Sequence, residues 1–337
     1  MAKFFLTISI PTYNRSKSVS KLVNEILSYN GSSVNIVVQD NCSSDNTKSF
    51  FDNLKTDRVI YRRNDKNRGA AYNYLASLVD NDSDYSLFMI DKDYIDIDYL
   101  RTFIDFLKQQ QPAYGYVSLN RPKSSEINYN IYQKGEPAIR ATAYLSKHPT
   151  GYFYQSKLVT KQMVDNYFSK ISPTFPFPFE IINAQFGITN SAIIIDMPLL
   201  RQETRDDAVN NKSYSYNENN LFFSPIKRIE AFQIYYNNLF DLGINNKDKA
   251  VLFRDLYKRV LWQVSRGYKM AFEDNVITAH YGLKKRKVSL GEMIINLKAV
   301  YQNCKNNKPV NSGSQDLIIP FIIIIIRLCL SEMKSKL

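Results

Sequence analysis

The stretch FMIDKDYID, residues 88–96, joins an apolar run to two acids, Asp91 and Asp93, that are separated only by Lys92. Carboxylate oxygens bind hard divalent cations such as Mg²⁺ and Mn²⁺, and these ions keep coordination positions open for substrate phosphates. On an extended chain the side chains at i and i+2 point the same way, so both acids could face one metal site. The alternative is a capped turn, because aspartate is common just before helices.

Three other apolar segments also end in polar sequence. They are followed by PTYNR (11–15), DNCSSD (40–45) and RNDKNRG (63–69). Asn, Ser, Asp and Gly are ordinary turn formers, so one such loop alone would be weak evidence for a site. Four such loops, each after a successive predicted strand, indicate one shared binding site. In it, Asp40 could accept a hydrogen bond from a base, and Gly69 would allow a ligand to approach the backbone before a helix N-terminus that favours anions.

These loops need a scaffold that brings them to one edge. Short segments rich in Val, Ile, Tyr and Phe predict strands, and helical spacing of apolar residues predicts helices between them. The expected strands are 4–10, 34–39, 58–61, 85–90 and 114–119, and the expected helices are 16–29, 44–54, 70–79 and 98–110. This alternation predicts βαβ units and a mostly parallel α/β sheet, in which ligands bind at the carboxyl ends of the strands.

The remainder of the chain is less regular at first and then helical. We expect a loop or hairpin after residue 121, a strand at 191–196, and helices at 226–239, 247–267 and 290–303. The predicted domains are therefore 1–225 and 226–337. The apolar tail, residues 317–330, is shorter than the roughly 20 residues of a spanning helix. It either packs in the core or lies at a membrane interface.

Most of the net charge of +12 comes from the C-terminal region. Residues 226–337 hold 19 lysines and arginines against 9 acids, including the run Lys-Lys-Arg-Lys at 284–287. This excess predicts a phosphate-rich partner, either an anionic membrane or a nucleic acid. We favour the membrane and expect no nucleic acid, because no helix-turn-helix, zinc or RNA-recognition signature accompanies the charge.

The number and spacing of the cysteines and histidines indicate the cellular compartment of the protein. Cys42, Cys304 and Cys329 are far apart, and His148 and His280 are isolated. We expect no disulfide framework and no zinc site, as in a reducing compartment. The apolar stretch near the N-terminus is too short for a signal peptide and is better interpreted as a first strand. These features predict a cytoplasmic protein, peripheral at the inner face of the cell membrane.

The order of motifs SIPTYNR, VVQDNCSSDNT, NDKNRGAAYN and FMIDKDYI resembles the family 2 glycosyltransferases over about the first 120 residues. The resemblance implies the A-type nucleotide-sugar transferase fold, a Rossmann-like sheet, followed here by a mainly helical region. It implies that the nucleotide is held by Pro11, Tyr13, Asn14, Asp40, Asn67, Gly69, Asn73 and Asp91. It further implies that Asp91 and Asp93 form a DxD pair that engages ribose and a diphosphate-bound Mn²⁺ or Mg²⁺, with Asp93 acting in catalysis.

The resemblance also implies a reaction. Such enzymes mostly invert the anomeric carbon, and a general base deprotonates the acceptor hydroxyl while a cation stabilises the leaving diphosphate. The candidate base is Glu180, in PFPFE ahead of an apolar helical run, with Asp206 and Asp207 as second choices. Its structural alternative is an acid that only stabilises a helix N-terminus.

The predicted function is transfer of a sugar from a UDP-sugar to a hydroxyl of a glycan acceptor. We expect this acceptor to be lipid-linked and the reaction to serve bacterial capsule or surface polysaccharide synthesis. One alternative is a basic nucleic-acid- or membrane-binding protein on a transferase-like scaffold that has lost catalysis. The intact pair Asp91 and Asp93 argues against lost catalysis. A sugar nucleotidyltransferase is disfavoured because the loop after the first strand, PTYNRSKS, contains no glycine to hold a triphosphate.

Overall fold

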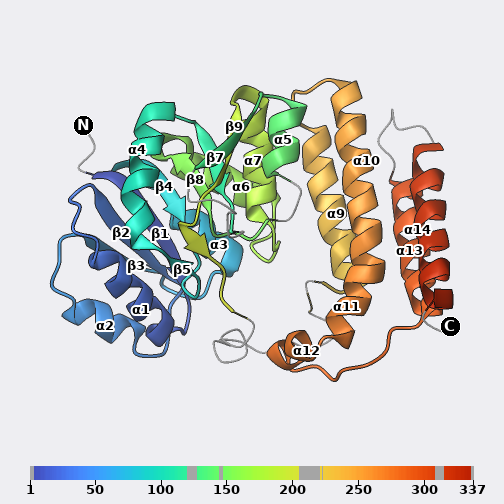
Figure 1. Ribbon diagram of the computed structural model, residues 1–337, viewed down its shortest axis with the longest axis horizontal. Helices are drawn as coiled ribbons and strands as arrows, with labels where there is room; N and C mark the ends of the chain where they lie inside the picture. Colours follow the sequence, from blue (N-terminus) through green and yellow to red (C-terminus); the bar gives the residue numbers. More distant parts are fainter. Residues whose placement is uncertain are drawn as a thin grey trace. The chain divides into compact units, whose positions relative to one another are not determined.

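The computed structural model describes residues 4–119, 127–143, 147–204, 221, 223–307 and 315–334 (Figure 1). The chain divides into two compact units, Met1–Asp207 and Ala208–Leu337. Every strand in the described part of the chain belongs to the first unit, and the described part of the second unit is helical.

An eight-stranded sheet forms the centre of the first unit, in the order β3-β2-β1-β4-β8-β6-β9-β7. Strands β3, β2, β1 and β4 are parallel, as are β6 and β9, whereas β8 and β7 run antiparallel to their neighbours. A separate two-stranded sheet pairs β10 with β5. The strands are β1 (Phe4–Thr12), β2 (Val34–Asp40), β3 (Val59–Arg63), β4 (Ser83–Phe88), β5 (Tyr94–Ile95), β6 (Tyr114–Val117), β7 (Asn128–Tyr132), β8 (Tyr152–Gln155), β9 (Ala192–Asp196) and β10 (Leu200–Arg201).

Helices cover both faces of the sheet (Figure 1). Successive side chains of a strand point to opposite faces of the sheet, so neighbouring residues of β8 contact the helices on its two faces. The Phe153 ring lies 5.6 Å from Phe103 of α4, while the neighbouring Tyr152 stacks on Phe179 of α7 at 5.1 Å. The helices of this unit are α1 (Ser16–Leu27), α2 (Thr47–Asn53), α3 (Ala70–Ala76), α4 (Leu100–Gln110), α5 (Glu136–Thr142), α6 (Lys161–Lys170) and α7 (Pro178–Thr189), with single 3₁₀ turns η1 (Ile97–Tyr99) and η2 (Ser156–Leu158).

The predicted alternation of strands and helices is confirmed over the first 120 residues. The apolar face expected on α1 is buried, with Val19, Val23 and Ile26 fully inaccessible to solvent. The region after residue 121, expected to be irregular, instead holds β7, α5, β8 and α6 in addition to α7. These elements are short, and β8 has only four residues, so neither strand alternation nor helical periodicity extends far enough to be recognised.

The second unit confirms the prediction of a helical C-terminal region. Its helices begin at polar caps: the Ser224 hydroxyl accepts from Lys227 N, and the Ser289 hydroxyl accepts from Glu292 N. No helix within the described ranges is long and apolar enough to cross a membrane. The elements are α9 (Pro225–Phe240), α10 (Asn246–Trp262), the π-helical turn η3 (Gln263–Gly267), α11 (Tyr268–Glu273), α12 (Asn275–Tyr281), α13 (Leu290–Asn306) and α14 (Gln315–Lys334).

Candidate active site

The carboxyl ends of three parallel strands meet at one edge of the sheet. Thr12, at the end of β1, is paired in register with Asp40, at the end of β2. The chain beyond β4 stays beside β1, because Met89 N donates to Ser9 O at 3.0 Å. The loops after β1, β2 and β4 therefore gather where α/β sheets bind their ligands, as the sequence predicts.

Asp91 is buried beneath the loop that follows β1. Its Oδ2 accepts from the Thr12 hydroxyl at 2.7 Å, and its Oδ1 pairs with the Arg15 guanidinium at 3.0 Å. Burial raises the pKa of Asp91, and the charge of Arg15 opposes that rise. The end of β1 thus supplies a hydroxyl, and the loop after it supplies a cation, to the first acid of the pair.

Asp93 has a different set of partners, from chain that is distant in sequence. The Thr150 hydroxyl donates to its Oδ2, and Glu203 N donates to its Oδ1 at 2.9 Å. His148 Nδ1 lies 3.4 Å from Oδ2. The Glu203 carboxylate pairs with Lys92, so the residue between the two acids also fixes this segment.

The two acids lie in a turn and not on an extended strand. Strand β4 ends at Phe88, and Asp93 N donates to Ile90 O at 3.1 Å to close the turn. The i and i+2 alternation expected from the sequence therefore does not apply here. Turn geometry instead directs Asp91 toward the β1 loop and Asp93 toward the segments around Thr150 and Glu203.

The surroundings of Asp93 place an imidazole beside a carboxylate. His148 Nδ1 is buried and has no hydrogen-bond partner among the residues that the structure describes. Burial lowers the pKa of His148, with Asp93 opposing, so the imidazole is neutral at neutral pH. A neutral imidazole nitrogen beside a carboxylate oxygen is a donor set that Mn²⁺ accepts. No group of three or more His, Cys, Asp or Glu side chains suited to a metal occurs in the described part of the chain.

Asp40 is a fully buried carboxylate at the end of β2. It accepts from Ser43 N at 2.9 Å, from the Ser43 hydroxyl at 2.5 Å and from the Tyr61 hydroxyl at 2.5 Å. The Arg63 Nε lies 3.3 Å from Oδ2. Burial and the bond to Asp40 raise the pKa of Tyr61, which keeps this phenol a donor. Asp40 thus organises the loop after β2, with both of its carboxylate oxygens engaged by residues of this unit.

A network of asparagine amides joins the strand ends. Asn73 is buried, and its amide donates to Thr12 O at 3.2 Å and to Gln39 O at 2.9 Å. Asn67 accepts from Asn41 at 2.7 Å and from Gly69 N at 2.9 Å. Gly69 has a φ of +88°, in the region that favours glycine, so the turn ahead of α3 depends on this residue.

The loop after β1 is anchored to the loop after β2. Asn14 has a left-handed φ of +52°, and its side-chain oxygen accepts from Ser44 N at 2.8 Å. Pro11 lies inside β1 and is buried, in register with Gln39, whereas Tyr13 is half-buried in the loop. Among the residues implied for nucleotide binding, Tyr13 and Asn14 therefore lie where β1 leaves the sheet.

The model of "Glycosyl transferase family 2" matches residues 7–181, which is half of the chain and includes every one of these site residues up to Glu180. The chain belongs to glycosyl transferase family 2. It is 31% identical over 114 residues to abequosyltransferase RfbV of Salmonella typhimurium, a match of 32% of this chain and 34% of that protein. The chain thus spans about a third of the length of this curated relative.

Solved structures show the same architecture. S. aureus TarS 1–349, crystallised with UDP-GlcNAc, superposes with a TM-score of 0.59 at 14% identity, covering 98% of this chain and 92% of that one. The complex of the same protein with UDP gives a TM-score of 0.54. At such identity the likeness shows the fold, and it confirms the predicted A-type architecture of this glycosyltransferase.

In this family 2 glycosyltransferase the predicted base Glu180 lies in the first turn of α7 and is only 7% exposed. Its neighbour Phe179 stacks on Tyr152, two residues beyond the Thr150 that binds Asp93. Successive residues of a helix point in different directions, so this contact of Phe179 does not bring the Glu180 carboxylate to Asp93. Asp206 and Asp207, the second choices for the base, lie outside the described residues.

Sequence reasoning missed the partners of the two acids. It gave no role to Thr12, Arg15 or Thr150, and it left His148 without an assignment. Only the first two had a local signal, because they stand in the polar loop PTYNR. His148 and Thr150 have no motif, since the structure alone brings them beside Asp93.

The lowered pKa of His148 predicts how the stability of this glycosyltransferase depends on pH. The folded protein holds the imidazole neutral below its ordinary pKa of 6.5, whereas the unfolded chain takes up a proton there. As the pH falls below 6.5, we expect the free energy of unfolding to decrease by up to about 1.4 kcal/mol per pH unit from this residue. His148→Gln should remove this part of the decrease. Urea denaturation near neutral and mildly acidic pH, with a chelator present, measures it, and equal losses in both proteins would contradict it.

Proposed function

We propose that this glycosyltransferase is a metal-dependent, inverting enzyme that moves a sugar from a UDP-sugar to a hydroxyl of a glycan acceptor. The observation that carries the proposal is the environment of Asp93, a buried carboxylate beside a buried, neutral His148 at the carboxyl end of the sheet. The family membership and the TarS complexes with UDP-GlcNAc and UDP support a uridine nucleotide as donor.

Asp93 and His148 would hold the cation, with Asp91 beside them on the same turn. When bound, Mn²⁺ or Mg²⁺ supplies positive charge against the diphosphate, which makes it a better leaving group. Asp91 keeps Arg15 and the β1 loop in place, and Arg15 adds a fixed positive charge at the same edge. Asp40, Asn14 and Tyr13 would contact the base and ribose from the loops after β1 and β2.

Glu180 would accept the proton of the acceptor hydroxyl as that oxygen attacks the anomeric carbon. The helix dipole at the first turn of α7 stabilises a carboxylate there, and the carboxylate is the form that accepts a proton. Pro178 begins this helix, and its ring restricts the backbone two residues before Glu180.

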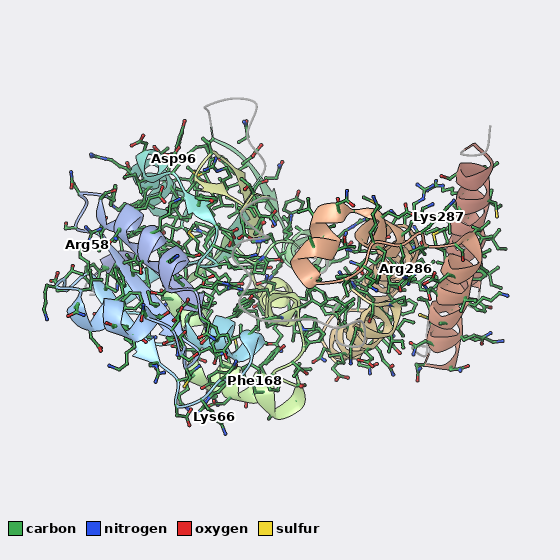
Figure 2. The ribbon with its side chains drawn as sticks, turned by 90° about the horizontal axis from the view of Figure 1, so that it is seen from below. Arg58, Lys66, Asp96, Phe168, Arg286 and Lys287 are labelled. Carbon is green, nitrogen blue, oxygen red and sulfur yellow. The ribbon has the colours of Figure 1, made fainter. Side chains whose placement is uncertain are left out.

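The proposal extends to the acceptor and to where the enzyme meets it. The acceptor would be a sugar of a surface or capsular polysaccharide; RfbV is by name an abequosyltransferase, which supports sugar transfer as the reaction. A lipid-linked acceptor would suit the basic C-terminal unit, which we propose holds the enzyme at the inner face of the membrane. Of the four cations at 284–287, Arg286 pairs with Glu292 at 2.8 Å, and Lys284, Lys285 and Lys287 are exposed. Figure 2 labels Arg286 and Lys287.

Calorimetric titration with UDP, with and without Mn²⁺, tests the proposal. We expect the wild-type protein to bind UDP tightly only with the metal, and Asp91→Asn/Asp93→Asn to lose that metal-dependent binding. Asp165→Asn, which removes an acid from an exposed ion pair on α6, is the matched control and should bind as the wild type does.

Two results would overturn parts of it. UDP binding of equal strength with and without Mn²⁺ would contradict the metal dependence. Binding of another nucleotide in place of UDP would contradict the proposal that the donor is a UDP-sugar. A screen of sugars linked to that other nucleotide would then identify the donor.

A further inference from the structure

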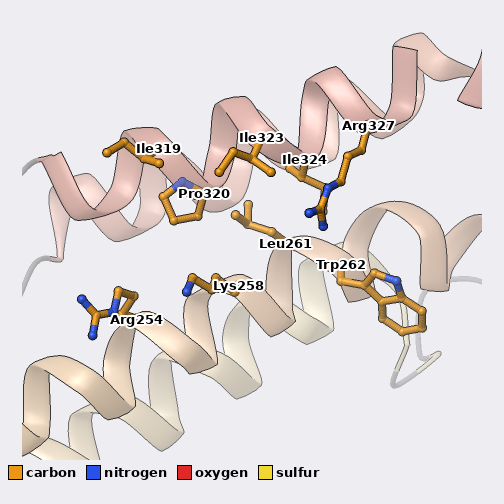
Figure 3. Close-up of a pocket in the computed structure, with 9 residues that line it drawn as sticks. All are labelled: Arg254, Lys258, Leu261, Trp262, Ile319, Pro320, Ile323, Ile324 and Arg327. Atoms are coloured by element: carbon orange, nitrogen blue, oxygen red, sulfur yellow. The ribbon is translucent and has the colours of Figure 1, made fainter. Parts of the chain in front are cut away.

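A cavity of about 570 Å³ lies between α10 and α14 in the C-terminal unit, and Figure 3 shows the side chains that line it. Its size falls within the range of small-molecule sites in proteins. Leu261 forms its buried floor, and Ile319 and Ile323 of α14 face it from the other side. This α10/α14 groove lies outside the catalytic unit and has no part in the chemistry described above.

The groove is lined by cations and by no acid. Arg254 and Lys258 come from successive turns of α10, and Arg327 comes from α14 (Figure 3). Lys258 has only a 3.9 Å contact with Asp255, and Arg254 and Arg327 have no acidic partner within the described residues. Three positive charges around an apolar floor attract a ligand that carries both a phosphate and a hydrocarbon chain.

The groove opens onto an exposed apolar surface of α14. Ile318, Ile322, Ile326 and Leu330 recur at every fourth residue, so they form one row, and they are 40%, 47%, 52% and 49% exposed. Trp262 is 45% exposed at the end of the groove. A row of large aliphatic side chains in water, flanked by arginine, lysine and tryptophan, is typical of helices that lie in a membrane interface.

Charge distinguishes between the possible occupants. A second copy of this chain would bring two cationic grooves together, because residues 226–337 carry 19 lysines and arginines against 9 acids. A nucleic acid would satisfy the cations but would leave the row of isoleucines in water. An anionic phospholipid satisfies both, since its phosphate meets the cations while its acyl chains meet the apolar row.

We propose that the α10/α14 groove binds an anionic phospholipid of a bilayer surface. Arg254 and Lys258 toward one end of the groove and Arg327 at the other bind lipid phosphates, and the apolar row of α14 enters the acyl-chain boundary (Figure 3). This deepens the proposed membrane contact of the C-terminal unit, because it moves that contact from the cluster at 284–287 to a defined groove. It is independent of the donor and of the transfer reaction.

Co-sedimentation of the full-length protein with phosphatidylcholine vesicles, with and without phosphatidylglycerol, tests it. We expect binding only when phosphatidylglycerol is present. Arg254→Gln/Lys258→Gln/Arg327→Gln should weaken binding by about fivefold per cation and roughly 100-fold in all. Lys284→Gln/Lys285→Gln/Lys287→Gln removes the same number of charges from the same unit and should weaken binding much less.

A second variant tests the apolar contact. Ile322→Ser/Ile326→Ser alters only exposed side chains and should lower the affinity for the same vesicles at least tenfold, with an unchanged circular dichroism spectrum. The inference is overturned if the glutamine variant of the groove binds like the wild type while the variant of 284–287 does not; the membrane proposal then survives. Absence of wild-type binding to anionic vesicles, or a dimer that Ile322→Ser/Ile326→Ser dissociates, overturns both. UDP titration of the same proteins reports separately on the transferase proposal.

Discussion

Glu180→Gln should lower the rate of sugar transfer by about 10²–10⁴-fold while leaving the affinity for UDP within error of the wild type. Glutamine keeps the size and the hydrogen-bonding capacity of the side chain but cannot take the proton of the acceptor hydroxyl. Initial-rate measurements with a UDP-sugar that the protein accepts, together with calorimetric UDP titration, separate the two effects.

Two comparisons make the Glu180 result specific. Asp165→Asn removes an exposed acid from α6 of the same unit and should retain full transfer activity. If Glu180→Gln lost UDP affinity and transfer in proportion, the carboxylate would be a structural acid of α7. The base would then have to be sought in Asp206 or Asp207.

Asp40→Ala should lower the free energy of unfolding of the catalytic unit by about 3 kcal/mol and weaken UDP binding at least tenfold. The change leaves the Ser43 hydroxyl, the Tyr61 hydroxyl and the Arg63 guanidinium without the acceptor that they share. Buried donors without a partner cost more than the bond itself contributed. Hydrogen exchange of amides in β1 and β2 measures the loss in this unit alone.

The control for Asp40 is Asp52→Ala, which breaks an exposed i,i+4 pair with Lys48 on α2 and should cost less than about 0.5 kcal/mol. Asp40→Asn is a second comparison, because an amide oxygen can still accept from Ser43 and Tyr61. Equal protection from exchange in Asp40→Ala and the wild type would show that the loop after β2 does not depend on this carboxylate.

The first half of the fold could be predicted because its signals are local. The buried face of α1 is a helical repeat within twelve residues, and the strands β1, β2 and β4 are short segments with Ile, Val, Leu, Phe and Tyr residues between polar turns. By contrast, β8 inserts antiparallel between β4 and β6, and its partners are 66–70 and 36–40 residues away along the chain. No local pattern specifies such a pairing, so this part of the sheet could not be read from the sequence.

The site divides in the same way. Asp40 accepts a hydrogen bond from Ser43, three residues later. Asp91 accepts from Thr12 and Arg15, which belong to the polar stretch PTYNR that the sequence indicates as part of a site. The environment of Asp93 depends on Thr150 and Glu203, 57 and 110 residues away. The residue types of the site could therefore be predicted, whereas the neighbours that set their protonation and orientation required the folded chain.

The bond from Glu203 N to Asp93 also sets an order of events during synthesis. Strand β10 pairs with β5, and Glu203 closes over Asp93, only when the chain has been made almost to the end of the first unit. A nascent chain that has emerged no further than α7 has the loops after β1 and β2 but lacks the hydrogen bond from Glu203 to Asp93. The surroundings of Asp93 are therefore completed together with the first unit, and a fragment that ends before Glu203 would lack one partner of this acid.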